Sequence, residues 1–160
     1  MGTKPKRPPQ LALRLDAEAP DLAARWREGA SLPYLGASVT LRLDTGCKEA
    51  MLADGELHLP LPPEATPRQI QDAAESWLRT RALRVISAQV VMAARHLGRE
   101  APKVSLSFAA RGSWAQVDER GLRFHWRLIE QAQETIAQVV ERAVAGLPRV
   151  EASLDLFALA

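Results

Sequence analysis

Apolar residues recur at helical spacing in two long stretches of the chain. The first stretch predicts a helix from Thr66 to Leu97, because Thr66-Pro67-Arg68-Gln69 forms a capping box with proline at the first helical position. Gly98 is the residue type that ends such a helix. The second stretch predicts a helix over residues 129–147. Its apolar stripe consists of Ile129, Ala132, Ile136, Val139, Val140, Ala143 and Leu147.

Alternating apolar and polar residues predict short strands before and between these helices. Segments 48–53 and 56–61 flank Asp54-Gly55, a dipeptide favoured in tight hairpin turns. Further strands are predicted at residues 11–15, 39–43, 104–108 and 122–126, and Leu32, Tyr34 and Leu35 lead into the second of these. A loop or hairpin tip is predicted at 112–121, a short helix or turn at 20–30, and a turn of helix at 154–159. The order of elements predicts an α+β fold, in which a small antiparallel or mixed sheet accompanies a long helix and a C-terminal helix.

Composition limits the domain organisation and the partners. Residues 1–9 are basic and proline-rich and are predicted to form a flexible arm, so residues 10–160 are expected to make up a single domain. The formal net charge is only +2, so total charge alone does not indicate nucleic acid or membrane as a partner. No apolar run reaches the roughly 20 residues of a membrane span. We expect the protein to be located in the cytoplasm. The single cysteine, Cys47, excludes an internal disulfide and a cysteine-built zinc site.

Several short segments, taken in order, resemble one known family. They are Leu32-Pro33-Tyr34-Leu35-Gly36, the tryptophan-containing segment 114–121, Trp126-Arg127-Leu128, and Ile136 with Val139-Val140. Over residues 31–160 this order resembles the bacterial YgjP-like metal-dependent hydrolases, relatives of the SprT-like metallopeptidases. The family usually has Trp-Gly-Ser-Cys and Asn-Trp-Arg-Leu, where this chain has Trp114-Ala115-Gln116-Val117 and His125-Trp126-Arg127-Leu128.

The resemblance implies a zincin-like C-terminal helix and a zinc cofactor. The family's His-Glu-x-x-His motif places two histidines on one helix face to hold zinc, with the glutamate as general base, and a third histidine follows downstream. By register from Val139-Val140, the ligand positions fall on Arg142, Gly146 and Ala152, and the base falls on Ala143. None of these four residues performs the family's role, so we expect no catalytic residues, no metal ligands and no cofactor.

The three histidines of the chain are not expected to replace the missing zinc ligands. His58, His96 and His125 have no metal-ligand spacing among them, although a site rebuilt from His58 and His125 stays open as an alternative.

Three residues are the candidates for ligand binding. Arg142 would enter the former metal pocket and bind an anion or a peptide carboxylate, with Trp114 and His125 beside it. The alternative is that Arg142 reaches solvent or pairs with Glu134, Glu141 or Asp155. Trp114 and Trp126 are expected at core and rim positions rather than in a platform that stacks on a ligand.

The leading hypothesis is therefore a catalytically inactive metallopeptidase-like domain that acts as a binding or structural module, with a protein or peptide partner. A second hypothesis is a metal-dependent hydrolase or peptidase with an unrecognised site. It would draw on the carboxylates Asp118, Glu119, Glu130, Glu134 and Glu141. A third is a nucleic-acid-binding accessory protein, suggested by the basic arm.

Overall fold

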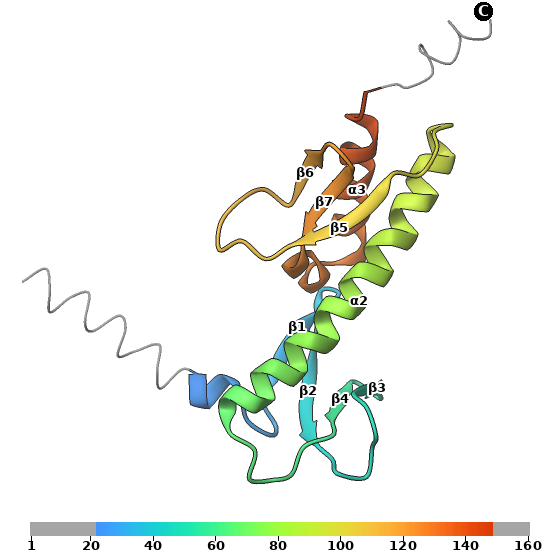
Figure 1. The fold of residues 1–160 in the computed structure, drawn as a ribbon. Coiled ribbons are helices and arrows are strands. Elements are labelled where there is room, and N and C mark those ends of the chain that lie inside the picture. Colours follow the sequence, from blue (N-terminus) through green and yellow to red (C-terminus); the bar gives the residue numbers. More distant parts are fainter. Residues whose placement is uncertain (1–21, 149–160) are drawn as a thin grey trace, which may run out of the picture. The chain divides into compact units, whose positions relative to one another are not determined.

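A computed structural model describes residues 22–148 of the chain (Figure 1). The predicted basic arm, the strand at 11–15, the helical segment at 154–159 and Ala152 lie outside the described residues. The chain divides into two compact units, residues 1–78 and 79–160, which are described one after the other. In the described part, the predicted α+β fold is confirmed, but with two small mixed sheets where one was expected.

The first unit contains a four-stranded sheet. Its strands are β1 (Ser31–Tyr34), β2 (Ala37–Leu43), β3 (Met51–Ala53) and β4 (Glu56–Leu59), in the order β1-β2-β4-β3. The sheet is mixed because β2 and β4 are parallel while the other two pairs are antiparallel. The hairpin at Asp54-Gly55 is confirmed, and both residues have the positive φ angles of its predicted turn, 52° and 76°. A short helical turn occupies residues 22–25, within the predicted segment 20–30.

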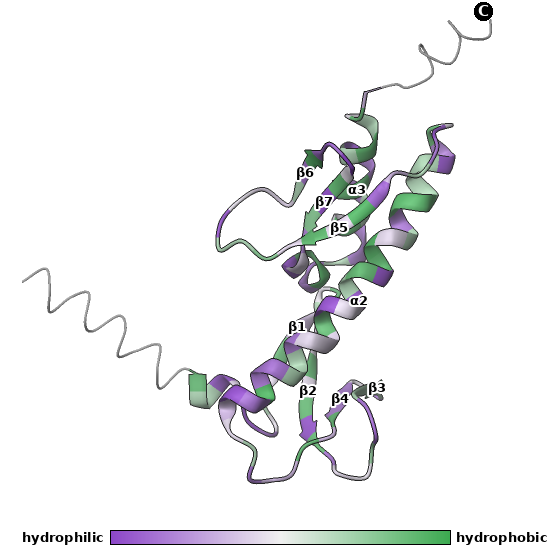
Figure 2. Cartoon of the chain, viewed as in Figure 1, coloured by the Kyte–Doolittle hydropathy of each residue, from purple (hydrophilic) through white to green (hydrophobic). Residues whose placement is uncertain are grey.

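The long helix α2 (Pro67–His96) confirms the predicted element almost to the residue. Thr66 Oγ1 accepts a hydrogen bond from the Gln69 backbone N–H at 3.1 Å, and Gln69 Oε1 accepts one from the Thr66 N–H at 2.9 Å. Figure 2 shows apolar and polar residues interspersed along this helix. The buried residues lie at every fourth position: Ile70, Ala74, Leu78, Ala82, Ile86, Val90 and Ala94. The buried face is narrower than the apolar pattern of the sequence, since the apolar residues Leu83 and Val91 of this helix are exposed.

The second unit has a three-stranded sheet made of β5 (Lys103–Ser107), β6 (Ala115–Asp118) and β7 (Gly121–His125), in the order β5-β7-β6. Strand β7 is parallel to β5 and antiparallel to β6. The prediction of a loop or hairpin tip over residues 112–121 was wrong for β6. Its alternation, Ala115-Gln116-Val117-Asp118, is only four residues long, and the pairing with β7 that completes the strand is not visible in so short a local pattern.

Two further boundaries in this unit differ from the prediction. The strand predicted at 122–126 ends at His125, because Trp126 begins a short 3₁₀ helix, η2 (Trp126–Glu130). The helix predicted at 129–147 is correspondingly shorter, and α3 spans Gln133–Ala145. The apolar residues of η2 are buried like those of a helix, so the periodic stripe continues across a break in the helical hydrogen bonds. None of the helices within residues 22–148 is long and apolar enough to cross a membrane.

Candidate binding groove

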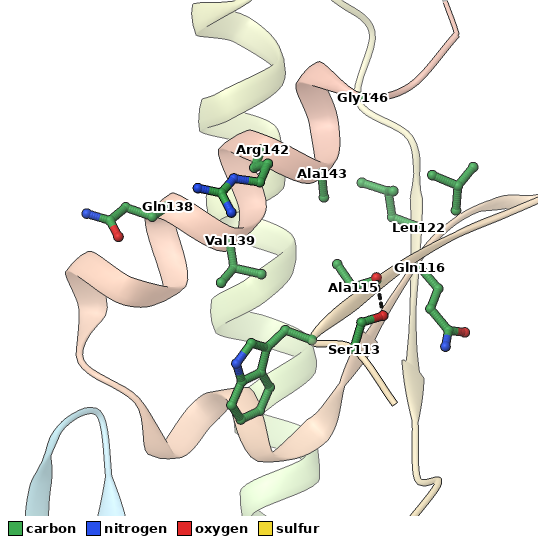
Figure 3. A pocket seen from close by; sticks show the side chains of 11 residues that line it. Ser113, Ala115, Gln116, Leu122, Gln138, Val139, Arg142, Ala143 and Gly146 are labelled. Atoms are coloured by element: carbon green, nitrogen blue, oxygen red, sulfur yellow. Dashed lines mark hydrogen bonds between the residues drawn. The ribbon is translucent and has the colours of Figure 1, made fainter. Parts of the chain in front are cut away.

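A groove of about 400 Å³ lies within the second unit, between β6 and α3. One wall comes from β6, the residues before it and β7, and the other from one side of α3. The groove is lined by Ser113, Trp114, Ala115, Gln116, Val117, Leu122, Gln138, Val139, Arg142, Ala143 and Gly146. Figure 3 shows Val139 and Ala143 pointing from α3 into the groove, with Ala115 and Leu122 on the opposite wall. The volume lies within the range of small-ligand and peptide pockets, about 300–1,000 Å³.

The orientation of α3 follows from its own sequence. Ile136, Val140 and Val144 are fully buried and recur at every fourth residue, so they fix the helix face that packs on the unit's core. At 100° per residue, Val139 and Ala143 fall on the neighbouring side of the helix, which faces the groove. The same packing that holds α3 in place therefore presents these side chains to the groove.

The sheet wall is built on β7. Leu122 is buried and stands opposite Val117 in the antiparallel register. Val117 itself has 59% of its surface exposed, and Trp114 has 39% exposed. Two large apolar side chains therefore remain accessible to solvent at the sheet wall of the groove.

His125 stands next to this wall but does not line the groove. Its ring contacts the Trp114 ring edge-on, with 6.1 Å between centroids. Its Nδ1 accepts a hydrogen bond from the Arg127 N–H at 3.2 Å, which requires the proton to be on Nε2 in the neutral ring. That Nε2 lies 2.7 Å from the Ala109 carbonyl oxygen and donates to it. His125 thus has both ring nitrogens engaged in backbone contacts and supports Trp114 from outside the groove.

Among the described residues, Arg142 is the only charged one that lines the groove. Its side chain is exposed and lies beside Gln138 at the rim (Figure 3). Within residues 22–148, no ion pair joins Arg142 to Glu134 or Glu141, the two described acids expected as alternative partners. Asp155 lies outside the described residues. The walls that the described residues supply therefore combine apolar and neutral polar side chains with a single cation and no anionic side chain.

Three of the four positions identified through the family's zinc motif line this groove: Arg142, Ala143 and Gly146. Their chemistry does not fit zinc. Arginine offers no lone pair and repels a divalent cation, while alanine and glycine have no side-chain donor atoms. Across the described part of the chain, no three His, Cys, Asp or Glu side chains come together in a way that could hold a metal ion.

Some of the carboxylates and histidines considered as alternative catalytic groups contact other side chains. Glu130 pairs with Arg127 at 3.0 Å, and Asp118 pairs with Arg123 at 3.1 Å. In the first unit, the His58 ring lies between Asp44 and Glu56, at 3.4 and 3.5 Å. These contacts join partly exposed side chains, and none of them sets a nucleophile beside a base.

Trp126, the other tryptophan for which the sequence allowed a core or a rim position, lies in the core. It is 5% exposed, and the guanidinium groups of Arg127 and Arg79 lie 4.7 and 5.4 Å from its ring centre. Trp126 is therefore a core residue flanked by cations, whereas Trp114 belongs to the groove.

Sequence reasoning singled out Arg142 and Trp114 but missed the polar residues Gln116, Gln138 and Ser113 and the apolar Val117. Gln138 stood four residues before Arg142 on the predicted helix, and this spacing was the only available signal for it. The other three depend on β6, which was not predicted.

Comparison with known protein families gives a match over most of the chain. The model of a family described as YgjP-like, metallopeptidase domain, matches residues 10–141, and so ends one residue before Arg142. No curated protein and no solved structure matches the chain.

Proposed function

Because the chain belongs to the YgjP-like metallopeptidase family, we propose that it is a member without hydrolytic activity that acts as a binding module through the groove between β6 and α3. The observation that carries the proposal is the chemistry of α3. Arg142, Ala143 and Gly146 line the groove at the places where the motif would have a ligand, the base and the second ligand, and none can fill that role.

The groove favours binding over a purely structural role. A domain kept only for its shape gains packing energy when a former active-site cavity is filled by side chains. Here the small residues Ala143 and Gly146 leave the space open, and Trp114 and Val117 keep exposed apolar surface beside it. Exposed aromatic and aliphatic side chains around a concave site are typical of binding surfaces.

Nucleic-acid binding is a second candidate function, favoured by the distribution of charge. Residues 79–148 contain eleven Lys and Arg against six Asp and Glu, although the whole chain has a net charge of only +2. The test is fluorescence anisotropy with single-stranded and duplex DNA at several salt concentrations. Binding that weakens steeply with salt would support this function, and absence of binding at low salt would reject it.

Metal content and turnover test the leading proposal. The purified full chain is dialysed against zinc, freed of excess metal and measured by mass spectrometry, and then incubated with a denatured-protein substrate with and without EDTA. We expect substoichiometric zinc and no EDTA-sensitive cleavage. Stoichiometric zinc bound with micromolar or tighter affinity, or cleavage that EDTA abolishes, would overturn the proposal.

A further inference from the structure

We propose that the groove binds an extended peptide segment that places a carboxylate on Arg142 and an apolar side chain against Trp114 and Val139. This inference rests on the proposed function and names the ligand class of the same site.

The charge of the groove selects a carboxylate. Of the described residues, Arg142 is the only charged one on its walls, and no acid among them forms an ion pair with it. The guanidinium group donates two parallel hydrogen bonds to a carboxylate, in a geometry that matches the two oxygens. Gln138 and Ser113 add neutral polar groups to the same walls, so the site favours an anion without offering a competing negative charge.

The remaining walls select apolar side chains. Trp114, Val117, Leu122, Val139 and Ala143 are apolar and line the groove together. Burying Trp114 and Val117 under a ligand would remove the exposed apolar surface that they now present to water. The ligand therefore combines at least one aliphatic or aromatic side chain with its carboxylate.

The way β6 borders the groove points to an extended chain. Side chains of a strand alternate between the two faces of a sheet, so a cavity on one face touches every second residue. Here three successive residues, Ala115, Gln116 and Val117, all line the groove. The groove therefore borders β6, the terminal strand in the order β5-β7-β6, and also reaches the sheet face that carries Leu122. A strand edge binds an extended peptide through main-chain hydrogen bonds.

Peptide binding is measured by fluorescence anisotropy of labelled octapeptides rich in valine and leucine. One peptide carries a central glutamate and an amidated C-terminus, and a second carries glutamine and a free C-terminal carboxylate. A third carries glutamine and an amidated C-terminus, and so has no carboxylate. The first two distinguish a side-chain from a terminal carboxylate, and we expect at least one of them to bind at least about tenfold more tightly than the third. Equal affinity for all three would overturn the proposal.

Variants of the full chain identify the residues. Arg142→Gln should weaken binding of the preferred peptide at least about tenfold but leave the carboxylate-free peptide unchanged. Arg84→Gln removes the same charge from an exposed position of α2 outside the groove and should change affinity less than about twofold. Equal effects of the two substitutions would show non-specific charge attraction and overturn the proposal.

Two further outcomes would replace the peptide by another occupant. Residues 149–160 contain Asp155 followed by Leu156 and Phe157, a sequence that meets the same chemical requirement. Tighter peptide binding in a full-length Phe157→Ala variant would make that segment of the chain a competitor and overturn the assignment to a separate peptide. Binding of single-stranded DNA that Arg142→Gln weakens would assign the groove to nucleic acid instead.

Backbone pairing has its own readout. A version of the preferred peptide with N-methylated residues at its centre loses main-chain donors but keeps its side chains and its carboxylate. It should bind at least about tenfold more weakly than the unmodified peptide. Unchanged affinity would overturn pairing along β6. A zinc-free, inactive protein that binds none of the peptides would end this inference but leave the absence of hydrolysis intact, whereas zinc-dependent cleavage would end the proposed function itself.

Discussion

The guanidinium group of Arg99 donates a hydrogen bond of 3.0 Å to the carbonyl oxygen of Leu147, just beyond the end of α3. The same nitrogen also contacts the Val144 carbonyl oxygen in the last turn of the helix. The last carbonyls of a helix have no partner within it, and a cation there also opposes the negative end of the helix dipole. Arg99 thus holds the turn that contains Gly146, at one end of the groove.

Loss of this contact should loosen the end of α3. Arg99→Met keeps an unbranched apolar side chain but removes the donors, and we expect the free energy of unfolding to fall by about 1–2 kcal/mol. Hydrogen exchange of the amides of residues 144–147 should accelerate. Arg95→Met is the matched control, because Arg95 is an exposed cation near the end of α2. If both variants unfold at the same urea concentration, the contact does not stabilise α3.

Gly121 should tolerate no side chain. Its φ is +152°, and a Cβ there would overlap the Lys103 carbonyl oxygen of the neighbouring strand β5. Gly121→Ala is expected to cost about 2–4 kcal/mol, since backbone strain and a clash with a fixed backbone atom add together.

The control for this prediction is Gly98→Ala. Gly98 also has a positive φ, +66°, but a Cβ at this position would meet no atom of the described residues within 4 Å. Only the conformational strain remains, about 1–2 kcal/mol. Urea unfolding that shows equal losses for the two variants would mean that β5 moves aside to admit the methyl group.

Some of these elements could be predicted from the sequence because their determinants are local. The capping box of Thr66 and Gln69 and the turn at Asp54-Gly55 each depend on a few adjacent residues, and both form as predicted. Strand β6 could not be predicted in this way. Its conformation depends on pairing with β7, and the alternation from Ala115 to Asp118 spans only four residues, too few to indicate a strand alone.

Only part of the groove could be predicted, because some of its residues belong to recognisable sequence segments and others depend on β6. Arg142 and Trp114 were found through a resemblance in sequence order, and both line it. His125 was a third candidate for the same site, but it does not line the groove. Its ring instead contacts Trp114 and bonds to backbone atoms, a detail that depends on where the 3₁₀ helix η2 begins. Side-chain direction at the junction of a strand and a helix is not encoded in apolar periodicity.

Acid should remove one stabilising contact of the first unit. The hydrogen bond from Arg42, 2.8 Å long, holds the pKa of Glu56 below its ordinary value of 4.5. A carboxyl group whose pKa is lower in the folded state stabilises the fold above its unfolded pKa, and this contribution disappears as the pH falls through the folded pKa. Glu56→Gln should therefore lower the urea midpoint at pH 7, and its difference from the parent chain should shrink as the pH falls through the folded pKa of Glu56.

The control for the pH dependence is Glu49→Gln, since Glu49 is exposed and forms no ion pair in the described part of the chain. Its difference from the parent chain should stay small at every pH. A Glu56→Gln effect that persists unchanged at acid pH would mean that the ion pair with Arg42 is not its cause.

Restoring the family's motif tests whether the register on α3 is right. The variant Arg142→His, Ala143→Glu, Gly146→His and Ala152→His places two histidines four residues apart on the helix side that lines the groove, with the downstream histidine of the motif. We expect it to bind zinc with micromolar or tighter affinity, measured by competition with a chromophoric chelator.

The matched control moves every substitution back by one residue, to Glu141→His, Arg142→Glu, Ala145→His and Glu151→His. It keeps the histidine spacing but rotates the pair about 100° away from that side of the helix, so it should bind zinc at least about tenfold more weakly. Equal zinc affinity in the two variants would show that the register assigned to Arg142 and Gly146 is not the family's, and would remove the main support for a lost zinc site.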